Sequence, residues 1–133
     1  SINGVNSIAQ WAAVAAINSS LQDASYLKFM KREYAFRRDK MFEALSKIPG
    51  FKPFYPRGTF FLWVDLDPEI YKRMKIKNAD DLSNTLAEMG IGSTPGDAFG
   101  QACLNSIRFS FSCSTKMVME GVEFLAAGIT RRF

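Results

Sequence analysis

One long apolar stripe constrains the fold of this chain more than any other feature. Between residues 25 and 48, apolar side chains recur at steps of three, four and seven, namely Leu27, Met30, Tyr34, Met41, Leu45 and Ile48. Such steps place side chains on one face of an α-helix. A helix of about 24 residues is roughly 36 Å long, and Pro49-Gly50 ends it. We therefore expect a helix over residues 25–48, capped by Asp23 or Ser25, with one side against a core.

The segment before this helix is apolar on nearly every side. Residues 7–18 are rich in alanine and carry no charged side chain, so we expect a helix that is buried on several sides. We expect Ser19–Asp23 to separate the two helices. The longest uninterrupted apolar run, Trp11–Ile17, is far shorter than the roughly 20 residues that a bilayer requires. No membrane partner is therefore expected, and no signal peptide is recognisable.

Strand patterns follow the long helix. Phe51–Tyr55 contains Pro53, which restricts it to the edge of a sheet. Phe60–Val64 is aromatic and β-branched, as in a central strand. Ser106–Ser112 alternates between apolar and polar side chains. With a helix capped by Asn78 and another capped by Ser114, these patterns predict an α+β fold, in which helices cover a small, mostly antiparallel sheet and residues 1–133 form a single domain.

Composition excludes several chemistries. The chain has no histidine, which removes Ser-His and Cys-His pairs and every zinc site that uses imidazole. Two cysteines, Cys103 and Cys113, are too few for a four-cysteine metal site. We therefore expect no metal within the chain, and none of its paired carboxylates makes a persuasive acid–base dyad. Unclustered thiols suit a reducing compartment, which predicts a cytoplasmic location.

Arg108 is the strongest candidate for a binding residue. It lies on the polar side of the predicted strand 106–112, opposite Ile107 and Phe109. A guanidinium on a rigid strand can bind a carboxylate through two parallel hydrogen bonds. An exposed strand arginine without a ligand is the alternative.

Three further segments have both an ordinary and a functional explanation. Gly58-Thr59-Phe60-Phe61 joins a turn to a buried strand, as any hairpin connection does. Gly90–Gly100 holds four glycines but lacks the spacing of a phosphate-binding loop. Lys28–Lys40 has six basic and two acidic residues and so carries the whole net charge of +4. This stretch fits a solvated helix face, a contact with another domain, or a nucleic-acid contact.

Taken in order, the chain resembles the C-terminal small domain of a class I/II aminotransferase, a pyridoxal-phosphate enzyme of the aspartate aminotransferase fold type. The matching segments are Ser7–Ala13, the basic helix 25–48, Pro56–Trp63, the series Gly90-Ile91, Pro95-Gly96 and Phe99-Gly100, and Ser106–Ser110. Each segment alone is weak, whereas their order and spacing together are specific. The resemblance covers nearly all of the chain.

The resemblance implies a function for several residues. Arg108 would hold the substrate α-carboxylate, and Gly58, Thr59 and Phe60 would line the substrate side. The N-terminal helices, residues 5–48, would include the helix between the large and small domains. The intact protein would be a homodimer that transfers an amino group between an amino acid and a 2-oxo acid. It would use pyridoxal 5'-phosphate and would contact no nucleic acid.

The chain also departs from the family pattern. In the family, the lysine that binds the cofactor belongs to the large domain, and none of the nine lysines here lies in the matching sequence context. The resemblance therefore implies that the cofactor-binding large domain is absent and that the isolated chain is inactive and holds no cofactor. The alternatives are a fragment of a same-fold pyridoxal-phosphate lyase or aminocyclopropane-carboxylate synthase, and a stand-alone basic binding module.

Overall fold

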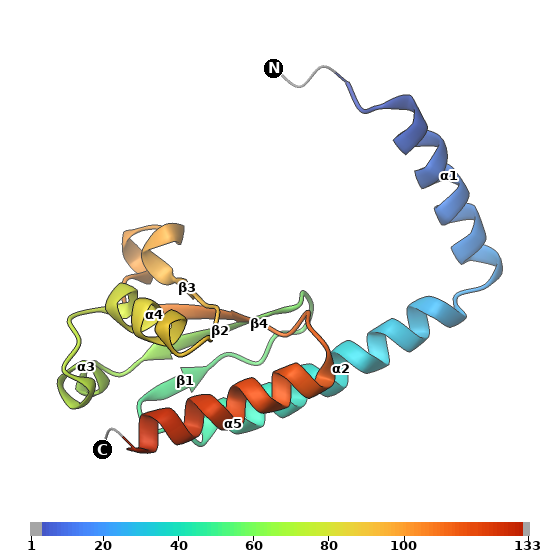
Figure 1. The fold of residues 1–133 in the computed structure, drawn as a ribbon. Coiled ribbons are helices and arrows are strands. Elements are labelled where there is room, and N and C mark those ends of the chain that lie inside the picture. Colours follow the sequence, from blue (N-terminus) through green and yellow to red (C-terminus); the bar gives the residue numbers. More distant parts are fainter. Residues whose placement is uncertain (1–3, 132–133) are drawn as a thin grey trace. The chain divides into compact units, whose positions relative to one another are not determined.

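A computed structural model describes residues 4–131 of the chain. Contacts divide the chain into two compact units, Ser1–Glu33 and Tyr34–Phe133. Figure 1 shows the order of the elements: two helices, two strands, two helices, a short strand with two 3₁₀ turns, a fourth strand and a last helix. This mixture of helices and strands is the predicted α+β fold.

A small antiparallel sheet forms the centre of the second unit. Its strands are β1 (Phe51–Pro53), β2 (Phe61–Leu66), β3 (Thr94–Pro95) and β4 (Ser106–Ser110). Their order across the sheet is β1-β2-β4-β3, and each adjacent pair is antiparallel. The predicted edge position of β1 and the predicted central position of β2 are thus confirmed. The sequence does not indicate β3, because a strand of two residues leaves no periodic pattern.

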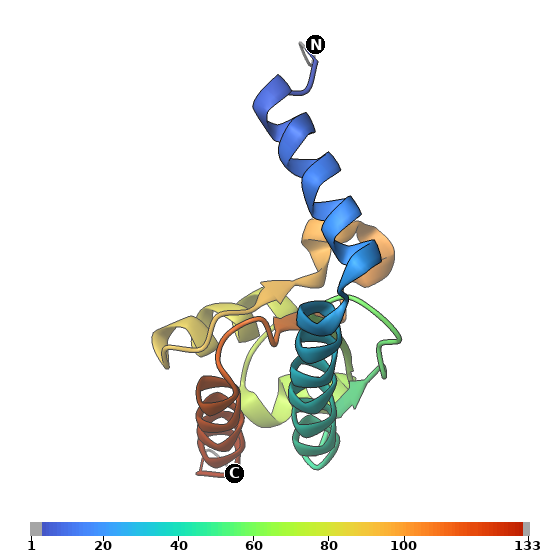
Figure 2. The same ribbon diagram turned by 90° about the vertical axis from the view of Figure 1, so that its right-hand side faces the viewer.

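Helices cover one face of this sheet and form the core with it. They are α2 (Ser25–Ser46, here from Tyr34 onward), α3 (Pro68–Met74), α4 (Ala79–Glu88) and α5 (Thr115–Arg131). The two long helices run side by side beneath the sheet (Figure 2). Fully buried side chains of the core include Leu45, Leu62, Val64, Ile70, Leu82, Leu86, Ile107, Phe111, Leu125 and Ile129. The stripe predicted for the long helix therefore faces the core at Met41 and Leu45, whereas its first residue, Leu27, is 41% exposed.

Local sequence signals set the ends of these helices. The Asn78 side chain accepts a hydrogen bond from the backbone N–H of Asp81 at 2.9 Å and caps α4 as predicted. Gly90, just beyond α4, has a φ of 82°, which favours glycine over other residues. The Ser114 hydroxyl accepts a hydrogen bond from Met117 at 3.3 Å, before α5. These contacts satisfy backbone N–H groups that a helix start leaves without partners.

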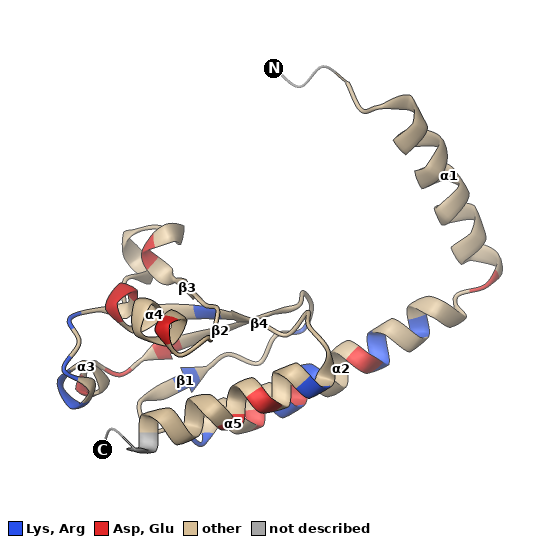
Figure 3. Ribbon diagram, viewed as in Figure 1, with Lys and Arg blue, Asp and Glu red and all other residues tan. Residues whose placement is uncertain are grey.

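The first helix, α1 (Ser7–Gln22), differs from the prediction in two respects. It continues through the segment expected to break it, because serine and glutamine do not stop a helix and only Asp23 does. It also has no buried residue, although burial on several sides was expected. Trp11 is 75% exposed and Ile8 is 79% exposed. Figure 3 shows that α1 carries no charged side chain, unlike α2.

The segment between α4 and β4 folds into β3 and two 3₁₀ turns, Gly96–Phe99 and Gln101–Cys103. Gly96 is buried where these turns meet β4. A Cβ atom at this position would overlap the carbonyl oxygen of Cys103 and lie 2.8 Å from that of Ser106. Because both neighbours are backbone, only glycine fits without a shift of the chain.

Replacing Gly96 with alanine is expected to destabilise the chain by about 1–3 kcal/mol, the usual cost of an overpacked site. Chemical unfolding followed by circular dichroism measures this change. Gly92→Ala is the matched control in the same segment, because a Cβ there has no neighbour within 4 Å. Equal unfolding midpoints for the two variants would contradict the close packing at Gly96.

Candidate functional site

Arg108 lies at the centre of the sheet, on the face that the long helices leave open. In the register of β4 it is directly opposite Trp63 of β2 on one side and Thr94 of β3 on the other. Its neighbours along the strand, Ile107 and Phe109, are buried on the core face, whereas Arg108 is half-buried. The predicted alternation of this strand is confirmed for these residues.

Two aromatic rings and one hydroxyl contact the Arg108 guanidinium. Its Cζ lies 3.9 Å from the ring centroid of Phe61, in β2, and 4.7 Å from that of Phe99, at the end of the first 3₁₀ turn. Its Nη2 donates a hydrogen bond of 3.3 Å to Oγ1 of Thr94. Rings attract a cation through their π-electrons. The side chain is therefore supported by three residues from three separate elements.

The guanidinium borders an open cavity of about 320 Å³. Its lining consists of Phe61, Gly92, Ser93, Thr94, Arg108 and Ser110. Within residues 4–131, no carboxylate forms an ion pair with Arg108. A half-buried guanidinium of this kind can bind an anion, and its planar shape favours a carboxylate or a phosphate.

The carboxylate nearest along β2 is occupied by other donors. Asp65 Oδ1 accepts a hydrogen bond of 2.7 Å from the Ser106 hydroxyl and one of 3.2 Å from the Trp63 indole N–H. Trp63 in turn packs edge-on against Phe99, with ring centroids 5.3 Å apart. Asp65 therefore helps to hold Trp63 in place, and it forms no ion pair with Arg108.

The three other residues predicted for the site, Gly58, Thr59 and Phe60, are exposed. The Phe60 ring lies 4.4 Å from that of Phe61, so it extends the ring contacts that begin at Arg108. None of these three residues lines the cavity. Thr59 has a φ of 65°, a conformation that is unusual for a β-branched residue.

A polar cluster ties the segment before these residues to α2. Asp39 accepts hydrogen bonds from Arg38 at 2.8 Å and from the Tyr55 hydroxyl at 2.7 Å. These bonds, chiefly the one from Arg38, hold the pKa of Asp39 below its usual value. The Tyr55 pKa is raised because its hydroxyl donates to that carboxylate. The cluster thus fixes the start of the loop whose end carries Phe60.

The sequence predictions missed Phe61, Thr94 and Phe99, the residues that contact Arg108. Alternation along 61–66 could have identified Phe61, because it shares a strand face with Trp63 and Asp65 rather than with Leu62. Thr94 and Phe99 lie in short elements without a periodic pattern. No sequence signal places them beside Arg108.

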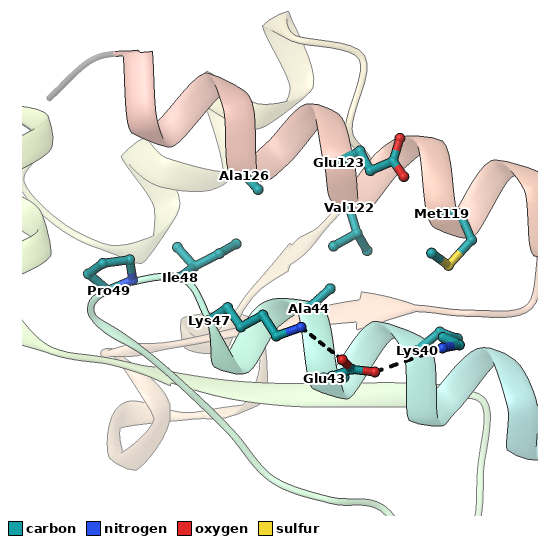
Figure 4. Close-up of a pocket in the computed structure, with 10 residues that line it drawn as sticks. All are labelled: Lys40, Glu43, Ala44, Lys47, Ile48, Pro49, Met119, Val122, Glu123 and Ala126. Atoms are coloured by element: carbon teal, nitrogen blue, oxygen red, sulfur yellow. Dashed lines mark hydrogen bonds and ion pairs between the residues drawn. The ribbon is translucent and has the colours of Figure 1, made fainter.

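A second open space, of about 340 Å³, separates α2 from α5 (Figure 4). Glu43 on its α2 side forms ion pairs with Lys47 at 2.8 Å and Lys40 at 3.9 Å. The α5 side contributes Val122 and Ala126, among others. None of the residues predicted for the site lines this groove.

Residues 4–131 contain neither a metal-like cluster nor a helix that could span a membrane. No three histidine, cysteine, aspartate or glutamate side chains in that range gather as they would around a metal ion. None of the helices in the same range is long and apolar enough to cross a membrane.

The sequence matches the family described as aminotransferase class I and II over residues 2–125. The chain belongs to this aminotransferase family. The bifunctional aspartate aminotransferase and glutamate/aspartate-prephenate aminotransferase of Petunia hybrida is 32% identical over 126 residues. The aspartate aminotransferase of Bacillus sp. (strain YM-2) is 30% identical over 115 residues.

This chain spans only about a quarter of the length of these two relatives. The two alignments cover 91% and 86% of this chain but only 26% and 28% of the respective relatives. Among solved structures, the aspartate aminotransferase of Thermus thermophilus with maleate is similar over 96% of this chain and 31% of its own. Its TM-score is 0.78 at 24% identity, which supports the fold.

Proposed function

We propose that this chain is the small domain of a pyridoxal-phosphate-dependent aminotransferase and supplies the arginine that binds the substrate α-carboxylate. The observation that most supports this proposal is that the Arg108 guanidinium borders an open cavity and has no ion-pair partner within residues 4–131. The chain also belongs to this family. The complete enzyme, meaning the full protein that contains this chain, transfers an amino group between an amino acid and a 2-oxo acid.

In this proposal Arg108 both binds and orients the substrate. Two parallel hydrogen bonds to the carboxylate fix the direction of the bond to the α-carbon, which a single-point contact would leave free to rotate. Phe60, with its ring against Phe61, and the exposed Gly58 and Thr59 would lie on the substrate side of Arg108, outside the cavity itself. Closure of the domain over the substrate excludes water.

The residues of this chain do not fit a cofactor site. Pyridoxal phosphate is held by a lysine through a Schiff base, and no lysine lines the Arg108 cavity. Eight of the nine lysines are exposed, and Lys40, the ninth, is half-buried on α2 beside Glu43. We therefore propose that the cofactor is held outside this chain and that the chain alone is inactive.

The surface of α1 supports a role within a larger protein. Its apolar side chains, including Trp11 and Leu21, are exposed, and a continuous apolar surface of this kind is typical of an interface. We propose that other parts of the complete enzyme, a cytoplasmic homodimer, cover this helix.

A same-fold pyridoxal-phosphate lyase or synthase is the alternative to an aminotransferase, because it would use Arg108 in the same way.

The basic stretch 28–40 gives little support to a nucleic-acid module. Arg37 donates to the Cys113 carbonyl at 2.8 Å and to the Thr115 hydroxyl at 3.1 Å, and Arg38 pairs with Asp39.

Borohydride reduction with pyridoxal phosphate, followed by peptide mapping, tests the proposal. In the isolated chain we expect weak labelling spread over several exposed lysines and no amino transfer. In the complete enzyme we expect one lysine outside residues 1–133 to be labelled stoichiometrically, together with amino transfer from an amino acid to a 2-oxo acid. Stoichiometric labelling of a single lysine within the isolated chain would contradict the proposed division of the site.

A further inference from the structure

We propose that Phe99 and Thr94 are positioning residues for Arg108: they hold its guanidinium so that one chosen edge faces the substrate carboxylate. This inference rests on the proposed function of Arg108. It concerns residues of the segment between α4 and β4 that need not touch the substrate themselves.

Two aromatic rings order the guanidinium of Arg108 by packing against it. An arginine side chain has several rotatable bonds, and ordering it costs conformational entropy. Phe61 and Phe99 contact the Arg108 Cζ at 3.9 and 4.7 Å from their ring centroids. With rings from two different elements against it, the guanidinium is already ordered before a ligand arrives.

The hydrogen bond to Thr94 engages one edge of the Arg108 guanidinium. A guanidinium has two edges that can bind a carboxylate with two parallel hydrogen bonds, and both edges use a hydrogen of Nη2. Nη2 donates one hydrogen to Thr94 Oγ1 at 3.3 Å. The bond to Thr94 therefore engages one edge and leaves the other available for a carboxylate.

Contacts with Trp63 and the turn at Gly96 hold Phe99 in place. Its ring packs edge-on against Trp63, whose indole N–H donates to Asp65. Its backbone belongs to the turn that starts at Gly96, which is packed tightly against the Cys103 and Ser106 carbonyls. The ring is nonetheless 46% exposed. Burial in the core therefore does not explain its position, whereas contact with Arg108 does.

The test uses Phe99→Leu and Thr94→Val in the complete enzyme. Phe99→Leu removes the ring and keeps an apolar side chain, and Thr94→Val replaces the hydroxyl with a methyl group of similar size. We expect the Michaelis constant for the amino acid and the dissociation constant of maleate, a non-reacting dicarboxylate, to rise about three- to tenfold in each variant. We expect kcat to fall less than these constants rise, because the carboxylate is bound in the ground state as well as in the transition state.

Matched substitutions separate positioning from a merely structural role. Phe99→Tyr keeps the ring and Thr94→Ser keeps the hydroxyl, so both should bind maleate like the unaltered enzyme. Phe124→Leu makes the same chemical change at an exposed site on α5 and should have no effect. Unchanged maleate binding in Phe99→Leu and Thr94→Val, with weakened binding in Arg108→Lys, would overturn this inference and leave the proposed function intact. Unchanged binding in Arg108→Lys as well would overturn both.

Discussion

Replacing Arg108 with lysine in the complete enzyme is expected to lower kcat/KM by about one to two orders of magnitude. Lysine keeps the positive charge but loses the planar fork, so two parallel hydrogen bonds become one point contact. Hydrogen bonds to charged groups contribute about 1.5–3 kcal/mol each, which corresponds to this loss. Arg108→Ala should reduce kcat/KM further, because the bound carboxylate would then have no cation beside it.

Stability should respond much less than activity to these substitutions. Arg108 lies on the open face of the sheet, opposite the buried Ile107 and Phe109, so the core is unchanged in both variants. Steady-state kinetics and thermal unfolding on the same samples separate the two effects. Arg73→Lys, on the exposed surface of α3, is the matched control and should leave kcat/KM unchanged. A lysine variant of Arg108 with full kcat/KM would show that this residue is an ordinary strand arginine.

Replacing Phe111 with alanine is expected to destabilise this chain by about 3–5 kcal/mol, the usual cost of removing a buried phenylalanine. Phe111 is 1% exposed, and its ring packs edge-on against Tyr34 of α2 at a centroid distance of 6.4 Å. Its backbone N–H also donates to the Phe60 carbonyl at 2.9 Å. The residue thus joins α2 to the sheet just beyond β4.

The free energy of unfolding from urea titration measures this loss. Domains of this size are stable by only about 5–15 kcal/mol, so the variant should lose a large part of its stability. Phe124→Ala is the control, because Phe124 is 54% exposed on α5 and should change the free energy by no more than about 0.5 kcal/mol. Similar losses at both positions would contradict the assigned core.

Periodic patterns explain why much of the fold could be predicted from the sequence. The alternation in 106–112 placed Ile107 and Phe109 in the core and Arg108 on the opposite face, as the structure shows. Within residues 34–48, apolar steps of three and four identified the core-facing side of α2. In each case the side chains of one regular element face a single core, so spacing alone carries the information.

The surroundings of Arg108 could not be predicted in this way. Phe99 and Thr94 reach the guanidinium through short turns and a strand of two residues, whose geometry depends on the close contact at Gly96. The exposure of α1 also escaped prediction, because an apolar sequence indicates that a surface needs cover but not whether the same chain provides it. The roles of Gly58, Thr59 and Phe60 remain predictions.

The binding of maleate to the complete enzyme tests the proposed carboxylate site most directly, because binding alone requires no turnover. Its dissociation constant should be measured for the unaltered enzyme and for Arg108→Lys under one buffer and salt condition, since charge contacts weaken with salt. We predict binding at least about tenfold weaker in the lysine variant, from the loss of one hydrogen bond to a charged group. Equal dissociation constants would contradict the assignment of Arg108 as the residue that holds the substrate carboxylate.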